Sequence, residues 1–168
     1  MNFSTELLDL SYKLVRLAIK NNIKISTAES CSGGLVSALI TCVSGSSEVF
    51  DCGFITYSND AKNKMIGVNQ SLLKEFGAVS KEVADKMAQG VIKNSNANLS
   101  ISITGVAGPN SDNSNKKVGL VFISSFNKNT NKLISKKFEF DGNRDQIRNL
   151  SVKKAILILI DQINNEAN

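Results

Sequence analysis

The stretch IKISTAESCSGGLVSALITCV, residues 23–43, decides the fold of this chain. Its opening segment, 23–27, is short and rich in β-branched side chains, which predicts a strand. Small residues fill 28–34, which ends in a glycine pair and is typical of a tight turn. Apolar residues then continue over 35–43 as a helix. The stretch therefore predicts a strand, a turn and a helix in direct succession.

The same alternation extends along the rest of the chain. Periodic apolar residues and capping residues predict helices over 4–21, 58–64, 70–76, 80–94 and 144–163. Strand-like runs of apolar and β-branched residues occupy 49–57, 99–104, 118–125 and 133–140. This order favours an α/β fold, and the late hairpin implies one antiparallel strand. We expect a single domain over 1–168, a three-layer α/β/α sandwich with a mixed, mostly parallel sheet of about five strands.

The composition limits the partners and the location of the protein. The net charge is +5, but the lysines are scattered and there is no tryptophan, so we expect no nucleic-acid partner. Such a charge suits a solvated surface or a phosphorylated small molecule. No segment is long and apolar enough for a bilayer, and no signal peptide is recognisable, so we expect no membrane contact. Three cysteines without a C-x-x-C pair fit a reducing, cytoplasmic location.

The chain contains no histidine. This absence excludes Ser-His-Asp and Cys-His catalysis, together with every metal site that uses histidine. A hydrolase built from this sequence must use lysine, tyrosine or a carboxylate as its base. We therefore expect no metal and no cofactor.

Three unusual segments follow predicted strands, at 28–34, 57–62 and 104–109. In open α/β sheets, ligands bind beyond the carboxyl ends of the strands. Because all three segments should lie at that edge, their convergence predicts a binding site there.

Ser30 is the candidate nucleophile, because it lies between a predicted strand and a predicted helix. Unpaired backbone N–H groups at a helix start can stabilise an anion or a developing oxyanion. Two alternatives remain open from the residues alone: Ser30 or Ser32 can simply cap the helix, and Cys31 is a rival nucleophile or a small buried residue.

Lys62 is the candidate base, since it should lie beside Ser30 just past the second strand. Its pKa would have to fall from the reference of about 10.4 to roughly 7–8 for efficient catalysis. Tyr57 could relay or donate a proton to the same centre. The alternative is that Lys62 is an ordinary surface charge of a basic protein.

Further candidate binding residues lie near the third strand and the last helix. The glycines of 105–109 could let the backbone approach a phosphate or a ring, although a plain turn fits equally well. Arg144 and Arg148 are four residues apart on one helix face, and guanidinium groups match phosphate oxygens. Ordinary exposed helix charge is the alternative for both.

At these residues the chain resembles the C-terminal domain family of competence-damage-inducible (CinA) proteins, whose standalone members are nicotinamide-nucleotide amidases. The similar blocks run in order over about residues 7–160 and include TAESCSGG at 27–34, GSS at 45–47, GFITYSNDAK at 53–62, GAVS at 77–80, TGVAGP at 104–109, VG at 118–119 and GNR at 142–144. The family fold is a three-layer α/β/α sandwich, in agreement with the pattern of elements.

The resemblance implies that the chain is a CinA C-terminal-like amidase, with Ser30 as nucleophile, Lys62 as base and Tyr57 as the third catalytic group. The implied reaction converts the carboxamide of nicotinamide mononucleotide into nicotinate mononucleotide and ammonia, without a metal. The substrate-binding residues implied are Cys31, Ser32, Gly33, Gly34, Gly45, Ser46, Thr104, Gly105, Ala107 and Arg144. A homodimer is a further expectation.

Two alternatives accompany this hypothesis: a non-catalytic nucleotide-binding or competence-related module of the same fold, and an amidohydrolase for a different small amide. The sequence also departs from the family. Ser32 replaces the usual threonine, and the loop at 110–117 lacks the usual glycine pair and a proline. The long form of the family carries an N-terminal nucleotide-processing domain, and we expect that activity to be absent from this chain.

Overall fold

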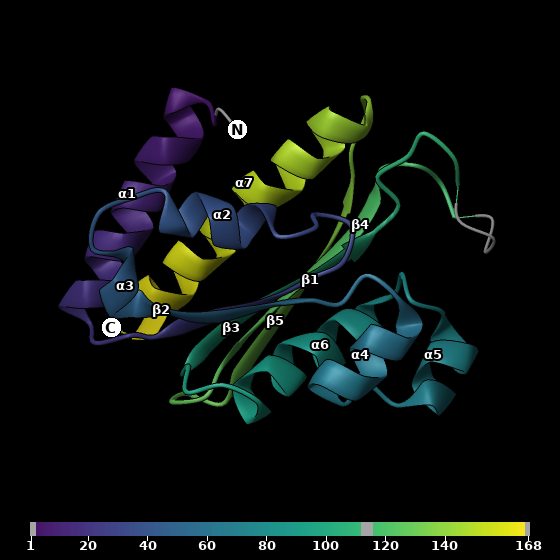
Figure 1. Cartoon of the computed structure of the whole chain (residues 1–168), viewed down its shortest axis with the longest axis horizontal. Coiled ribbons are helices and arrows are strands. Elements are labelled where there is room, and N and C mark those ends of the chain that lie inside the picture. The colour runs from purple at the N-terminus through teal and green to yellow at the C-terminus, as the bar shows by residue number, and fades with distance from the viewer. Residues whose placement is uncertain (1–2, 112–115, 167–168) are drawn as a thin grey trace.

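Five strands form one sheet in the order β2-β1-β3-β4-β5 in the computed structural model, which describes residues 3–111 and 116–166 (Figure 1). The strands are β1 (Ile25–Glu29), β2 (Phe50–Ile55), β3 (Leu99–Gly105), β4 (Leu120–Asn127) and β5 (Lys132–Glu139). The helices are α1 (Thr5–Lys20), α2 (Leu35–Thr41), α3 (Ser46–Val49), α4 (Asn59–Ile66), α5 (Gln70–Phe76), α6 (Lys81–Lys93) and α7 (Arg144–Glu166).

The sheet is mixed, as the sequence predicted. β1 pairs in parallel with both β2 and β3, with Ile25 opposite Phe50 on one side and Leu99 on the other. β4 is antiparallel to its neighbours β3 and β5, so β4 alone runs against the other strands. The expected direction of one strand of the hairpin is therefore confirmed.

Helices cover both faces of the sheet (Figure 1). α2 and α7 pack on one face, and α1 packs against these two helices. α6 lies on the opposite face, where α4 and α5 pack against it. The three-layer α/β/α arrangement is thus confirmed.

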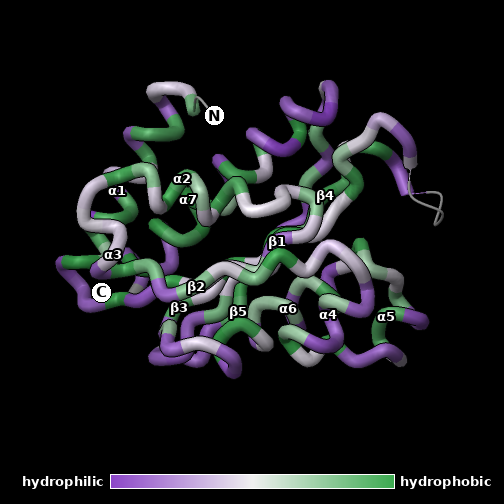
Figure 2. The backbone as a smooth tube through the Cα atoms, viewed as in Figure 1, coloured by the Kyte–Doolittle hydropathy of each residue, from purple (hydrophilic) through white to green (hydrophobic). Residues whose placement is uncertain are grey.

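Local sequence explains why the helices begin where they do. Ser4 and Ser80 cap α1 and α6, because each hydroxyl accepts a hydrogen bond from a backbone N–H of the first turn. Hydrophobic and hydrophilic residues alternate along α1, as expected for a helix with one buried face (Figure 2). The buried side of α6 includes Val83, Met87 and Val91.

Two of the boundaries that differ from the sequence prediction lie at the starts of β1 and β2. β1 begins at Ile25 rather than at Ile23, because the N–H of Ile23 donates to the carbonyl of Ala18 and completes the end of α1. Residues 46–49 form the short helix α3 after Gly45, where the sequence predicted a turn and the start of a strand. β2 consequently starts at Phe50.

The carboxyl ends of the three parallel strands meet at one edge. The N–H of Ser30 donates to Ile103 O at 3.0 Å, and the N–H of Thr56 donates to Glu29 O at 2.9 Å. These two bonds tie the segment after β1 to the segments around the ends of β3 and β2. The fold thereby brings the three predicted site segments together.

Candidate active site

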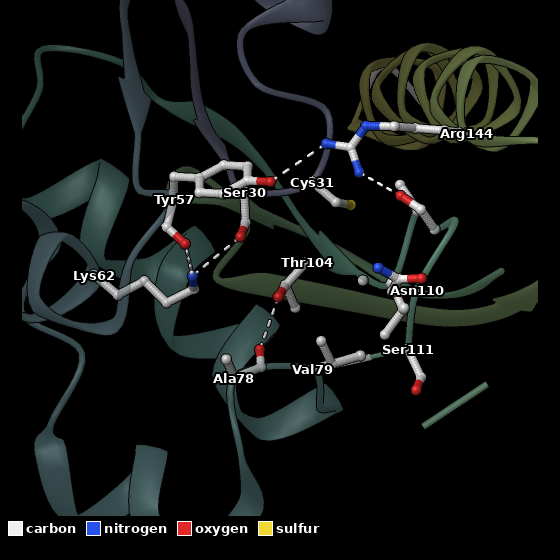
Figure 3. A pocket seen from close by; sticks show the side chains of 14 residues that line it. Ser30, Cys31, Tyr57, Lys62, Ala78, Val79, Thr104, Asn110, Ser111 and Arg144 are labelled. Atoms are coloured by element: carbon white, nitrogen blue, oxygen red, sulfur yellow. Dashed lines mark hydrogen bonds between the residues drawn. The ribbon is translucent and has the colours of Figure 1, made fainter. Parts of the chain in front are cut away.

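A cavity of about 240 Å³ lies beyond the carboxyl ends of β1, β2 and β3 (Figure 3). Eight predicted site residues line it: Ser30, Cys31, Tyr57, Lys62, Thr104, Gly105, Ala107 and Arg144. Six further residues complete its wall: Ala78, Val79, Val106, Gly108, Asn110 and Ser111. The convergence expected from the strand order is therefore present in the folded chain.

Lys62 and Ser30 are in direct contact at the base of this cavity. Lys62 Nζ donates to Ser30 Oγ at 3.0 Å, although 32 positions separate the residues in sequence. Lys62 Nζ also lies 2.8 Å from Thr56 O and 3.5 Å from Tyr57 O. The amine is therefore held between one hydroxyl and two carbonyl groups, and Figure 3 shows its contacts with Ser30 and Tyr57.

Burial changes the acid–base properties of Lys62. The side chain belongs to α4 but points inward, and only 1% of the residue is exposed. Desolvation lowers the pKa of the amine from the ordinary value of 10.5 to about 8. At pH 7 about one tenth of such amines are neutral, against less than about 0.1% for an ordinary lysine. The surface-charge alternative for Lys62 is therefore wrong.

Cys31 lines the cavity next to Ser30 but is poorly suited to attack. Its side chain is buried, and desolvation raises the pKa of the thiol to about 12. A thiol of this kind is almost entirely protonated at neutral pH, whereas the thiolate is the reactive form. The rival role of Cys31 as nucleophile is therefore disfavoured.

Tyr57 and Arg144 meet across the cavity. Tyr57 is 62% exposed, and its hydroxyl accepts a hydrogen bond from Arg144 Nη2 at 3.3 Å. Arg144 Nη1 also donates to Gly108 O at 2.6 Å. Among the described contacts, Tyr57 reaches Lys62 only through its main-chain carbonyl. The proton relay through the Tyr57 phenol is thus not visible in this arrangement.

The segment after β3 forms the wall opposite Ser30. Thr104 Oγ1 donates to Ala78 O at 2.7 Å, which ties the end of β3 to the segment before α6. Asn110 and Ser111 line the cavity from the following loop (Figure 3). The loop at 110–117 is the one whose sequence differs from the family pattern, and its residues 112–115 lie outside the described residues.

Sequence reasoning missed several wall residues as members of the site. Ala78 and Val79 are apolar and carry no chemical signal of their own, although they fall within the matched block at 77–80. Asn110 and Ser111 lie where the sequence departs from the family pattern, so the comparison of motifs could not identify them. Their position next to the site required the folded structure.

Five expected binding residues do not line the cavity: Ser32, Gly33, Gly34, Gly45 and Ser46. Gly45 and Ser46 lie at the start of α3, which precedes β2, and so at the end of that strand opposite Tyr57. The N–H of Gly34 donates to Glu29 Oε2 at 3.0 Å and is therefore not free to bind an anion. The expectation that these residues join Ser30 in one site of this chain needs this correction.

Arg148 is also separated from the cavity, unlike Arg144. Its guanidinium donates to Ser32 O at 2.8 Å and so stabilises the turn after Ser30 from outside the cavity. The question of which arginine faces the site is thereby answered in favour of Arg144.

The described residues contain no group of three or more cysteine, aspartate or glutamate side chains that could hold a metal ion. Within the same ranges, no helix combines the length and the apolar character needed to cross a membrane.

Known proteins provide an independent comparison. The model of the CinA C-terminal domain matches residues 8–163. A competence-damage inducible protein of Caldicellulosiruptor saccharolyticus is 48% identical over 152 residues, which are 90% of this chain and 36% of that protein. The chain thus spans about a third of the length of the curated relatives it matches.

Solved structures agree with this comparison. The competence/damage inducible protein CihA from Agrobacterium tumefaciens is 37% identical, with a TM-score of 0.93 over 98% of this chain and 99% of that one. A CinA superfamily protein from Escherichia coli is 27% identical, with a TM-score of 0.88 over 95% and 94% of the two chains. By sequence and by fold, the chain belongs to the CinA C-terminal domain family.

Proposed function

We propose that this protein is a serine amidase that hydrolyses the carboxamide of nicotinamide mononucleotide to nicotinate mononucleotide and ammonia. The observation that carries the proposal is the contact between Ser30 Oγ and the buried Lys62 Nζ, whose pKa is lowered to about 8. A nucleophile within hydrogen-bond reach of a base with a suitable pKa is the arrangement that nucleophilic catalysis requires.

The first step uses Lys62 in its neutral form. A neutral amine has two N–H groups and one lone pair, and the carbonyl groups of Thr56 and Tyr57 accept from the N–H groups. The lone pair is then directed at the Ser30 hydroxyl and takes its proton while Oγ attacks the carboxamide carbon. Lys62 becomes protonated, and the carboxamide oxygen becomes an oxyanion.

The oxyanion requires N–H donors close to Ser30. The N–H of Gly33 donates to Ser30 O, and the N–H of Gly34 donates to Glu29, so neither is available. The backbone N–H of Cys31 directly follows the nucleophile in the cavity wall and is the donor we assign to this role.

The remaining steps return the enzyme to its starting state. Protonated Lys62 gives its proton to the amide nitrogen as the C–N bond breaks, and ammonia leaves the acyl-enzyme. Neutral Lys62 then takes a proton from water, the resulting hydroxide attacks the ester, and the proton returns to Ser30 Oγ as nicotinate mononucleotide leaves.

Arg144 is the group we assign to the substrate phosphate. Its guanidinium bonds to a carbonyl and a phenol, and no carboxylate forms an ion pair with it among the described residues. An arginine without a carboxylate partner at the edge of a cavity keeps its charge for an anion.

The decisive experiment measures ammonia release from nicotinamide mononucleotide by the purified protein, by Ser30→Ala and by Lys62→Ala. Turnover by the wild type that both substitutions abolish is the expected result. Saturable binding of the mononucleotide without turnover would overturn the proposal in favour of the non-catalytic nucleotide-binding module. Turnover of other small amides that is indifferent to the phosphate would overturn the proposed substrate.

A further inference from the structure

Glu29 is a buried carboxylate directly before the nucleophile, and only 1% of the residue is exposed. Its Oε2 accepts from the N–H groups of Gly34 and Val36 at 3.0 and 3.1 Å. Its Oε1 accepts from the N–H and the hydroxyl of Ser37 at 2.9 and 2.8 Å. Four donors from the start of α2 therefore converge on this one side chain.

No ion pair is present to balance Glu29 within the part of the chain that the structure describes. The carboxylate is instead satisfied by N–H and O–H donors at a helix N-terminus, which also carries a partial positive charge. Both oxygens are used fully, since a carboxylate offers about four lone-pair positions. The side chain thus fastens α2 to the end of β1.

The main chain around Glu29 connects this attachment to the catalytic pair. Thr56 donates its N–H to Glu29 O at 2.9 Å, and Thr56 O accepts from Lys62 Nζ at 2.8 Å. One peptide segment therefore contacts both the residue before the nucleophile and the proposed base. A shift of the Glu29 main chain would change the distance between Ser30 Oγ and Lys62 Nζ.

A glycine on the neighbouring strand keeps space for the network. A Cβ atom at Gly53 would lie 2.5 Å from Ser37 Oγ and 3.0 Å from Thr27 Oγ1. These two hydroxyls lie 2.7 Å apart, within hydrogen-bond distance, and the Ser37 hydroxyl in turn donates to Glu29 Oε1. Any larger residue at position 53 must displace the Ser37 or the Thr27 hydroxyl. Gly53 itself does not line the cavity.

From these contacts we infer that Glu29 is a positioning residue for the serine nucleophile. Its carboxylate fixes the turn from Ser30 to Gly34 between β1 and α2, so that Ser30 Oγ faces Lys62. Glu29 lies outside the cavity wall and acts through Ser30. The inference rests on the proposed serine–lysine chemistry but not on the identity of the substrate.

The test is Glu29→Gln, because an amide keeps the shape but presents an NH₂ group to two of the four donors. Steady-state ammonia release from nicotinamide mononucleotide gives kcat and KM separately. Misplacing a reacting group by about 1 Å can reduce its rate on the order of 100-fold, so kcat should fall by about this factor while KM changes less than about twofold. Glu48→Gln is the matched control, since Glu48 is an exposed carboxylate in the first turn of α3.

A second measurement, the labelling rate of Ser30, tests the role of Glu29 without using the proposed substrate. A fluorophosphonate probe reacts with activated serine hydroxyls, and intact mass with peptide mapping gives its rate at Ser30. We expect Glu29→Gln to slow this labelling by a similar factor at a temperature well below unfolding, with Ser30→Ala as the blank. Labelled wild type that does not hydrolyse the mononucleotide would remove the proposed substrate and leave the inference about Glu29 intact.

Two further variants apply if Glu29→Gln does not fold. Ser37→Ala removes one of the four donors and should lower the labelling rate by about 3- to 10-fold. Gly53→Ala should lower it as well, but should add little in the Ser37→Ala background, where the closest clashing atom is gone. A folded Glu29→Gln or Ser37→Ala protein with the wild-type kcat and labelling rate, or with a raised KM alone, would overturn the inference.

Discussion

Lys62 Nζ lies 3.0 Å from Ser30 Oγ, and this contact joins the first turn after β1 to the side of α4 that faces the sheet. The lysine is enclosed by protein, and burial is the largest cause of its lowered pKa. Position and acid–base behaviour therefore have one origin, the packing of α4 against the edge of the sheet.

The rate of amide hydrolysis should depend on pH through Lys62. The amine must be neutral to accept the Ser30 proton, and its pKa is about 8. We expect kcat/KM to rise about tenfold for each pH unit well below pH 8 and to level off above pH 8. Initial rates between pH 6.5 and 10 provide the measurement. Lys62→Arg should be inactive throughout, since its guanidinium does not lose a proton in this range; a flat profile for the wild type would exclude Lys62 as the base.

Lys62 should also affect the stability of the fold in a pH-dependent way. Its pKa is about 8 in the folded chain and near 10.5 when unfolded, so the unfolded state binds more protons between these values. The cost of burying the charge is fully present below pH 8 and disappears as the pH rises to 10.5. It amounts to about 3 kcal/mol.

The comparison that isolates this effect is wild type against Lys62→Met, which fills similar space without a charge. Between pH 8 and pH 10.5, the free energy of unfolding of the wild type should rise by about 3 kcal/mol relative to that of Lys62→Met. Urea unfolding at several pH values measures it. A difference that stays constant over this range would contradict the lowered pKa.

Arg144→Ala should weaken substrate binding more than it slows the chemical step. A charged hydrogen bond to phosphate contributes about 1.5–3 kcal/mol, so KM should rise about 10- to 100-fold while kcat falls less. Steady-state kinetics with nicotinamide mononucleotide measures both constants. Arg16→Ala is the matched control, because Arg16 is exposed on α1 and does not line the cavity. An unchanged KM for Arg144→Ala would remove this residue from the phosphate site.

The cysteines should differ in reactivity. Burial raises the pKa of the Cys31 thiol to about 12, whereas Cys42 is exposed at the end of α2. We expect iodoacetamide at pH 7.5 to alkylate Cys42 in the native protein and to leave Cys31 unmodified until the chain is unfolded. Peptide mapping after timed quenching provides the measurement. Rapid alkylation of native Cys31 would restore it as a candidate nucleophile.

The sequence by itself determined most of the helices and strands, though not α3, and the edge of the sheet at which the site forms. Strand and helix patterns depend on residues close together in the chain, so the unit at 23–43 and the capped helices after Ser4, Ser58 and Ser80 were predictable. The motifs at 27–34, 53–62 and 104–109 also identified the family.

Only the tertiary structure decided which of the candidate site residues are in contact with one another. Ser30 and Lys62 are 32 positions apart, and their contact depends on how β1, β2 and α4 pack together. The same packing lowers the pKa of Lys62, directs the N–H of Gly34 to Glu29 and leaves Gly45 and Ser46 at the far end of β2. Burial and non-local hydrogen bonds are properties of the packed chain, and no short stretch of sequence specifies them.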